Sequence, residues 1–417
     1  MEADFSNIES IINSMEGVTM KILLSIEKEF IKIGYRKNTN DVKNILVLRF
    51  NDIGDMIVSS GFFRELRYNY PDAHITLITS PHIKDMMELC PYINEILVFD
   101  RFSCYYNTFD IIFKKIFKFI QDYNLLQRNY DMSFILRWDR DNEVEMFFAY
   151  LCGARNRIGF GVSIYEFPRL TPLRYFATHL CLTRIITTPV GLLSEPEKIL
   201  YMLENLGLEV KNRNLELYYN DNDIEKAKTL LKNIPPNNKK VLLGIGASNN
   251  SKKYPVERYI EAIKVLLDNY DLTFVIVGSN SESTDAAVVE KTFPENVCNL
   301  CNKTTLRETE AITSMIDIYL GNDTGVMHMA AVENKPIIAL YKDAKSIDEK
   351  IPFMSAPLLF PPYQTRSIIL RPEKQLGECQ ASTIFGGCKH IDTAHCITQI
   401  KPKHIIYSFE KIYKELV

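Results

Sequence analysis

The chain lacks a long apolar run, an excess of basic charge and the start of a secretory signal. No stretch approaches the run of about 18 apolar residues that spans a bilayer. The formal net charge of -3 argues against nucleic acid as a partner, because phosphate binding usually needs a basic surface. Glu2 and Asp4 stand where a secretory signal has Lys or Arg. We therefore expect a cytoplasmic protein, and its nine cysteines to be reduced thiols.

The G-x-G-x-x-G fingerprint of dinucleotide-binding folds is also missing, which weakens an NAD interpretation. What is present is a repeated alternation of apolar strands and amphipathic helices. It begins with a strand at 43–50 and a helix at 56–70, and it starts again at residue 241. The predicted fold class is α/β, with two doubly wound parallel-sheet domains that face each other across a cleft. A length of 417 residues suits two such domains.

One stretch, residues 318–341, combines a short strand, a Gly-Asn-Asp-Thr-Gly turn, a helix of small residues and a second strand. The first N–H groups of a helix have no partner within it, so an anionic ligand binds there readily. Asp323 or Thr324 is a candidate helix cap, Gly325 lets a ligand approach closely, and His328 lies one turn further on. From these residues alone, a phosphate site and an ordinary capped helix are equally favoured.

Two further side chains belong to the same predicted cleft. Asp55 follows the first strand, where ligands of open parallel sheets bind, and its carboxylate could take a proton from a hydroxyl. Taken alone, Asp55 is more often the cap of the helix that begins at Met56. Lys252 lies, next to Lys253, on a loop after the strand at 241, and both lysines are expected on the edge that carries the Gly321–Gly325 turn. A lysine beside a helix N-terminus suits a diphosphate.

Cysteines near the C-terminus form a candidate metal site. Cys379, Cys388 and Cys396 lie near His390 and His395, and thiolate and imidazole groups are ligands of zinc and iron. These three cysteines are not spaced as C-x-x-C, so free thiols are the favoured alternative.

Two amphipathic segments raise the question of a membrane. Residues 1–40 and 109–126 carry apolar side chains at helical spacing, and the second adds Lys114, Lys115 and Lys118. A basic amphipathic helix can lie on an anionic membrane. Packing on the protein with a solvated polar face is the favoured alternative for both segments.

Several motifs together resemble glycosyltransferase family 9, the ADP-heptose:lipopolysaccharide heptosyltransferases and their relatives. The matching pieces occur in the family's order over residues 43–415. They are Arg49 with Gly54-Asp55, Gly153-Ala154-Arg155 with Arg157-Ile158-Gly159-Phe160, Gly246-Ala247 with Lys252-Lys253-Tyr254-Pro255, residues 302–308, and Gly321-Asn322-Asp323-Thr324-Gly325 with His328. Tyr254 stands where the family usually has tryptophan.

This resemblance implies a GT-B architecture and inverting, metal-independent transfer of a heptose or related sugar from a nucleotide sugar, with ADP-heptose favoured. Asp55 matches the catalytic base and Lys252 the lysine on the donor phosphates. Asp323, Thr324 and Gly325 match the donor loop, with His328 close behind, and Glu282 is placed more loosely at the nucleoside.

The implied domains are a helical extension at 1–40, an acceptor domain at 41–220, a sugar-nucleotide domain at 236–400, and a helix at 401–417 that returns to the first domain. The acceptor is a lipopolysaccharide or another cell-surface glycan. Family relatives with a cysteine-rich C-terminal segment bind iron and modify proteins, so a protein acceptor is the alternative, and a silent scaffold subunit is a further one. No cofactor is required, and peripheral contact with the inner membrane is allowed.

Overall fold

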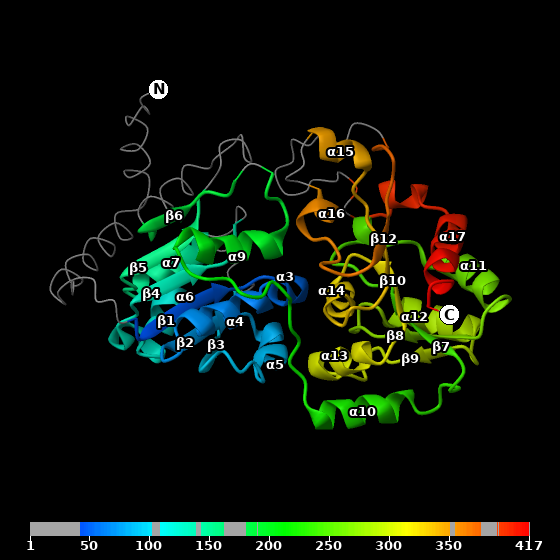
Figure 1. Ribbon diagram of the computed structural model, residues 1–417, viewed down its shortest axis with the longest axis horizontal. Helices are drawn as coiled ribbons and strands as arrows, with labels where there is room; N and C mark the ends of the chain where they lie inside the picture. The colour runs from blue at the N-terminus through cyan, green and yellow to red at the C-terminus, as the bar shows by residue number, and fades with distance from the viewer. Residues whose placement is uncertain are drawn as a thin grey trace.

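The structure is a computed structural model that describes residues 42–101, 109–138, 143–161, 181–189, 191–350, 355–376, 390 and 392–416. These residues form two α/β halves, which lie side by side (Figure 1). The predicted helical extension at 1–40 lies outside the described residues. No helix within the described ranges is both long and apolar enough to cross a bilayer.

Each half is built on a six-stranded parallel sheet. The first has the order β3-β2-β1-β4-β5-β6 and the second the order β12-β11-β10-β7-β8-β9. The strands of the first are β1 (Asn44–Arg49), β2 (His74–Thr79), β3 (Glu95–Val98), β4 (Met132–Ile135), β5 (Asn156–Phe160) and β6 (Arg184–Ile186). Those of the second are β7 (Lys239–Gly244), β8 (Leu272–Ile276), β9 (Val297–Asn299), β10 (Ile318–Asn322), β11 (Ile337–Leu340) and β12 (Ser367–Leu370).

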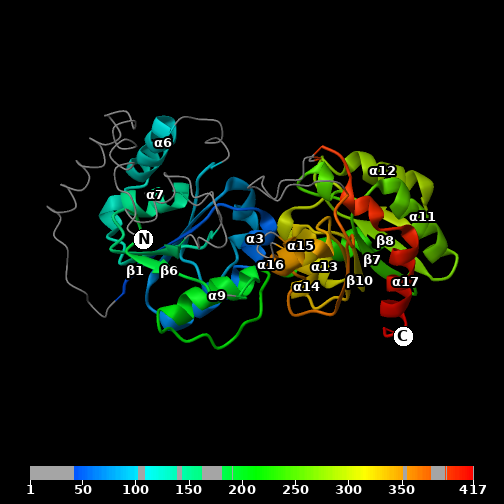
Figure 2. The same ribbon diagram turned by 90° about the horizontal axis from the view of Figure 1, so that it is seen from above.

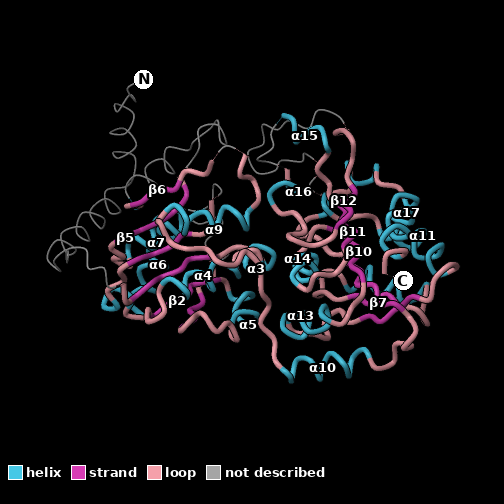
Figure 3. The backbone as a smooth tube through the Cα atoms, in the orientation of Figure 1, coloured by secondary structure: helices cyan, strands magenta, loops and turns pink. Residues whose placement is uncertain are grey.

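Helices cover both faces of each sheet, as Figures 2 and 3 show. In the first half the helical segments are α3 (Ile53–Ile57), α4 (Ser60–Asn69), η1 (Pro81–Ile83), α5 (Lys84–Met87), α6 (Phe109–Asp122), η3 (Leu125–Arg128), α7 (Glu143–Leu151) and α9 (Glu195–Asn205). In the second they are α10 (Asp221–Leu231), η4 (Asn250–Lys252), α11 (Val256–Leu267), α12 (Ser283–Thr292), α13 (Leu306–Ser314), α14 (Gly325–Val332), α15 (Lys345–Lys350), α16 (Ala356–Leu359), η6 (Cys396–Gln399) and α17 (Pro402–Tyr413).

The two sheets share one topology, because renumbering the second from β7 reproduces the order of the first. In such sheets the strand order reverses between the first and fourth strands, and ligands bind outside the carboxyl ends at that point. The reversals here lie between β1 and β4 and between β7 and β10. This confirms the predicted α/β fold of two doubly wound, Rossmann-like halves.

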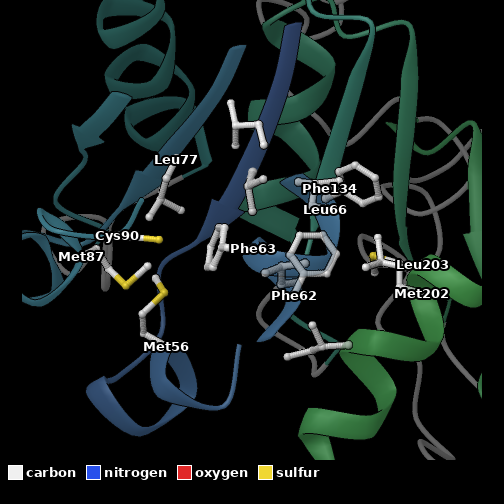
Figure 4. Packing of buried hydrophobic residues seen from close by; sticks show 14 of the residues in the cluster. Met56, Phe62, Phe63, Leu66, Leu77, Met87, Cys90, Phe134, Met202 and Leu203 are labelled. Atoms are coloured by element: carbon white, nitrogen blue, oxygen red, sulfur yellow. The ribbon is translucent and has the colours of Figure 1, made fainter. Parts of the chain in front are cut away.

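The strands are continuous apolar runs because both faces of each sheet are buried. Consecutive residues of β1, such as Ile45 and Leu46, belong to cores on opposite faces of the first sheet. On one face α4 packs Phe62 and Phe63 against Phe134 of β4 (Figure 4). Met56 lies there beside Met87 and Cys90, so the short helix α3 is anchored by its buried side.

The helix predicted at 56–70 is two helices. Helix α3 begins at Ile53 and ends at Ile57, and α4 begins at Ser60. Asp55 is therefore inside the first turn of α3 rather than its N-cap, a position held by Asp52. The N-cap position considered for Asp55 before Met56 is therefore wrong, although its side chain caps α3 as the N3 residue by accepting from the backbone N–H of Asp52.

The C-terminal helix does not return to the first half, so that prediction is also wrong. Helix α17 packs beside α11 on the second sheet (Figure 1). Its apolar stripe, Ile405, Phe409 and Ile412, is fully buried in the same core as Val241 of β7. Burying each such side chain stabilises the fold by about 1.5–3 kcal/mol, so the stripe fixes the helix where it lies.

Candidate functional site

The carboxylate of Asp55 lies at the carboxyl edge of the first sheet, at its reversal point. Helix α3 follows β1 directly, and its buried residues Met56 and Ile57 leave Asp55 on the other side, with its side chain 20% exposed. The backbone N–H of Asp52 donates to Oδ2 of Asp55 over 3.2 Å. The turn therefore holds the carboxylate in place while leaving it partly accessible.

Arg49, the last residue of β1, contacts this turn through its guanidinium group. Its Nη2 lies 3.4 Å from Oδ1 of Asp55 and donates to the Asp55 carbonyl over 3.1 Å. Nη1 donates to the carbonyl of Leu136 over 3.0 Å, and Nη2 also pairs with Glu195 Oε1 at 2.9 Å. In the sequence Arg49 stands out only as part of a motif, and no pattern there points to Glu195.

The predicted donor loop lies at the reversal point of the second sheet. Buried Asn322, at the end of β10, donates through its side chain to the carbonyls of Ile245 and Gly246, each over 3.0 Å. This fastens the Asp323-Thr324-Gly325 loop to the loop that follows β7. Thr324 is the N-cap residue of α14, and Gly325 is its first residue. The N-terminal N–H groups of α14 thus lie beside the carboxyl end of β7.

Lys252 comes from the loop after β7 to the same place. Its Nζ lies 3.4 Å from Oδ2 of Asp323. The pKa of Lys252 is raised above all by Asp323, and also by Asp343 and Asp55, while burial opposes them. The ammonium group therefore stays charged at neutral pH. Lys253 points elsewhere, because its Nζ pairs with Asp285 at 2.6 Å.

His328 lies where the two halves touch. It is 3% exposed, and its Nδ1 has no hydrogen-bond partner among the described residues. A Cβ added to Gly54 would lie 2.9 Å from its Cδ2. Burial lowers the pKa of His328, and Lys252 lowers it further while Asp323 opposes both. His328 is therefore neutral and lies at the contact between α3 and α14.

Glu282, the N-cap residue of α12, lies across the ends of β7 and β8. Its Oε2 accepts from the backbone N–H and the hydroxyl of Ser279, over 2.8 and 2.9 Å. A Cβ on Gly246 would lie 2.9 Å from Glu282 Cγ, so the carboxylate borders the loop that leads to Lys252. The structure thus brings the loosely aligned Glu282 to the carboxyl edge of the second sheet.

Contacts on two sides hold the halves in this arrangement. Arg307 of α13 pairs through Nη1 with Asp85 at 3.3 Å and with Glu88 at 3.1 Å, both from the α5 region of the first half. Elsewhere Tyr363 donates from its hydroxyl to Glu197 of α9. The two reversal points therefore face each other, with α3 against α14.

The candidate metal site is only partly described. Cys379 and Cys388 lie outside the described residues. The rings of His390 and His395 stack with centroids 4.0 Å apart, and Cys396 Sγ lies 3.6 Å from His395 Nδ1. Within the described ranges, no three His, Cys, Asp or Glu side chains are grouped as metal ligands would be.

Known proteins share this sequence pattern over most of the chain. Residues 196–385 match the family glycosyltransferase family 9 (heptosyltransferase). Lipooligosaccharide heptosyltransferase 2 of Haemophilus influenzae is 22% identical over 347 residues, which are 79% of this chain and 88% of that protein. Lipopolysaccharide heptosyltransferase 2 of Escherichia coli is 22% identical over 310 residues, 71% of this chain and 82% of that protein.

Solved structures share the fold. A glycosyltransferase family 9 protein of Veillonella parvula superposes with a TM-score of 0.68 at 19% identity, covering 90% of this chain and 98% of that one. The ADP-heptose lipopolysaccharide heptosyltransferase II of Escherichia coli gives 0.64 at 18% identity, covering 90% of this chain and all of that one. The architecture is that of GT-B heptosyltransferases. The sequence matches confirm the resemblance described above: residues 196–385 form a glycosyltransferase family 9 domain, and the chain is a glycosyltransferase.

Proposed function

We propose that this protein transfers heptose, with inversion, from ADP-heptose to a lipopolysaccharide or related cell-surface glycan. Its relatives in Haemophilus influenzae and Escherichia coli are lipooligosaccharide and lipopolysaccharide heptosyltransferases, which supports this sugar and this class of acceptor. The observation that carries the proposal is that α3, with the partly exposed carboxylate of Asp55, lies against α14, whose N-terminal loop is held beside the charged Lys252 by Asp323.

In the proposed reaction Asp55 is the general base. An acceptor hydroxyl gives its proton to Asp55 as its oxygen attacks the anomeric carbon of the sugar. The bond from that carbon to the diphosphate oxygen breaks on the opposite face, and ADP leaves with the electron pair. Attack and departure on opposite faces invert the configuration at the anomeric carbon.

The leaving diphosphate gains negative charge in this step, and two features of the second half offset it. Lys252 is a cation held by Asp323 at the carboxyl edge of the sheet. The N-terminal N–H groups of α14 carry a partial positive charge beside it. Fixed positive groups that face a developing charge stabilise the transition state. In this proposal Thr324 and Gly325 bind phosphate through backbone N–H groups, Glu282 contacts the nucleoside, and no metal ion takes part.

The acceptor is proposed to be a glycolipid at the cytoplasmic face of the inner membrane. Helix α6 presents Lys114, Lys118 and Ile111 at the surface, while Phe113 and Ile116 are buried in the protein. An exposed apolar side chain on the same helix face as two lysines suits an anionic lipid surface. Packing of α6 on the protein and contact with a membrane are therefore compatible.

Two measurements test the proposal. The first is thermal stability with ADP, UDP, GDP and CMP and their sugar forms, where a ligand at about 100 times its dissociation constant adds about 2.7 kcal/mol. A shift selective for ADP or ADP-heptose is expected. The second is incubation of labelled donor with lipopolysaccharide core and with candidate proteins. Label in the glycolipid is expected. Label only in protein would show that the acceptor is a protein, while the assignment as a transferase would stand.

A structural metal ion at Cys379, Cys388 and Cys396 is a separate proposal. Zinc or iron bound there would link the segment that contains them to η6. Metal analysis of the purified protein tests this directly. About one bound zinc or iron per chain, lost in Cys396→Ser but kept in Cys298→Ser, is expected. A metal-free protein with full stability contradicts it.

A further inference from the structure

A buried carboxylate, Glu195, lies close to the proposed base without a part in the proposed chemistry. It is the first residue of α9 and is 1% exposed, as is Arg49, with which it pairs at 2.9 Å. Its other oxygen, Oε2, has no hydrogen-bond partner among the described residues. Glu195 and Asp55 are therefore the two carboxylates at one guanidinium group.

We propose that Glu195 is a positioning residue for the transfer: it shares the charge of Arg49 with Asp55, and so sets both the place and the strength of the base. This inference rests on the proposed role of Asp55. It adds a residue from a different part of the chain, 146 positions away from Arg49.

The hydrogen bonds of Arg49 show how Glu195 can affect the position of Asp55. Three groups fix its guanidinium: the Leu136 carbonyl at 3.0 Å, Glu195 at 2.9 Å and the Asp55 carbonyl at 3.1 Å. The contact to the Asp55 carboxylate is longer, 3.4 Å. Arg49 thus holds the backbone of the α3 turn firmly and the reacting carboxylate more loosely. Removing the Glu195 charge removes the strongest competitor for the Nη2 group.

A buried ion pair of this kind is poor evidence for stability. Taking two charges out of water costs several kcal/mol, and replacing such pairs by apolar residues is often neutral or stabilising. The start of α9 carries a partial positive charge that favours the carboxylate. Even so, a function that depends on the charge explains its burial better than stability does.

The charged groups around Glu195 determine the pH at which it ionises. Burial above all, and also Asp55, raise the pKa of Glu195 to about 7, against the opposing effects of Arg49 and Lys198. Lys198 lies one turn along α9, with its Nζ 3.7 Å from the centre of the Trp138 ring. On the proposal, Glu195 therefore changes charge near neutral pH.

The consequence for Asp55 follows from charge balance. Ionised Glu195 offsets the charge of Arg49, so Asp55 can accept a proton from the hydroxyl. When Glu195 is protonated, the whole charge of Arg49 acts on Asp55 and makes it a weaker base. In the second half Lys252 is a further cation whose pKa Asp55 raises. The transfer rate should therefore rise as pH increases through the range in which Glu195 ionises.

The test measures kcat and KM from about pH 5 to 9 for wild type, Glu195→Gln and Glu204→Gln, with saturating acceptor. Glu204 lies on the same helix and is partly exposed, paired with Arg213. In Glu195→Gln we expect kcat to fall about 10- to 100-fold, KM for the donor to stay within about twofold, and the rise near pH 7 to disappear. Glu204→Gln should match wild type.

Two further variants make the outcome decisive. Glu195→Asp keeps the carboxylate on a shorter side chain, so kcat should be lower but should still rise with pH near neutral pH. This variant tests the inference if Glu195→Gln does not fold. A wild-type pH profile in folded Glu195→Gln, or a profile without the rise in Glu195→Asp, overturns the inference. If Asp55→Asn transfers at the wild-type rate, Asp55 is not the base and the inference falls with it, while the transferase function stands; if wild type transfers no heptose in this assay, the proposed function itself fails.

Discussion

Gly54 and His328 are in contact across the two halves of the molecule, so tightly that a Cβ on Gly54 would lie 2.9 Å from the Cδ2 of His328. The contact is reciprocal, because a Cβ on Gly325 would lie 2.8 Å from Cγ2 of Ile53. Gly54 precedes the proposed base, and Gly325 begins the proposed phosphate-binding helix. The two sites are therefore spaced by direct contact between α3 and α14.

Adding a methyl group at this contact should uncouple the two sites. Gly54→Ala and Gly325→Ala should each lower kcat about 10- to 100-fold, because displacements of about 1 Å between reacting groups have effects of that size. Assays of transfer, with melting temperatures recorded beside them, measure this. Gly207→Asn is the control, since its φ of +78° suits asparagine and nothing lies within 4 Å of its Cβ position. Wild-type kcat in both alanine variants would show that the contact has no role.

Lys252 should bind the diphosphate rather than the base or sugar. Lys252→Met removes a charge-assisted contact of about 1.5–3 kcal/mol, so the Kd for ADP should rise about 10- to 100-fold. The Kd for adenosine should not change. Calorimetric titration measures both. Lys253→Met is the matched control, because that lysine pairs with Asp285, and equal losses of ADP affinity in the two variants would argue against the assignment.

Stability should depend on pH through Glu310 of α13. This carboxyl is buried, and burial raises its pKa from 4.5 to about 8. Between these values the folded state binds more protons than the unfolded state, so this group's contribution to stability falls as pH rises. Glu310→Gln should therefore match wild type near pH 4.5 and be more stable by about 1–3 kcal/mol near pH 8.

Denaturant unfolding at several pH values measures the effect of Glu310→Gln. Exposed Glu225 of α10, replaced by glutamine, should leave the pH dependence of wild type unchanged. A constant difference between Glu310→Gln and wild type across the pH range would contradict the prediction.

The sequence was informative where one physical cause dominates. The fold was predicted from the apolar runs of β1 and β10 and from the glycine-containing turns that follow them. The same patterns placed Asp55, Lys252 and Asp323 at facing edges of the two sheets. It was uninformative where tertiary contacts determine the position of an element. The stripe of α17 predicts a packed helix but not which half it packs on.

Glu195 illustrates the second limit. An acidic residue beside proline in the first turn of a helix is typical of an exposed, dipole-stabilised position. Its burial results from Arg49 in a distant strand, which no local pattern reveals. The break between α3 and α4 was missed for a similar reason, since residues 56–70 read as one continuous helix.

The most direct measurement of the central claim is transfer by Asp55→Asn, an isosteric change that removes the base and keeps the shape of the turn. With ADP-heptose and lipopolysaccharide core we expect kcat to fall about 10³-fold or more, while the Kd for ADP stays within about twofold of wild type. Transfer at the wild-type rate would contradict the assignment of Asp55 as the base. Loss of ADP binding together with activity would place Asp55 in donor binding instead.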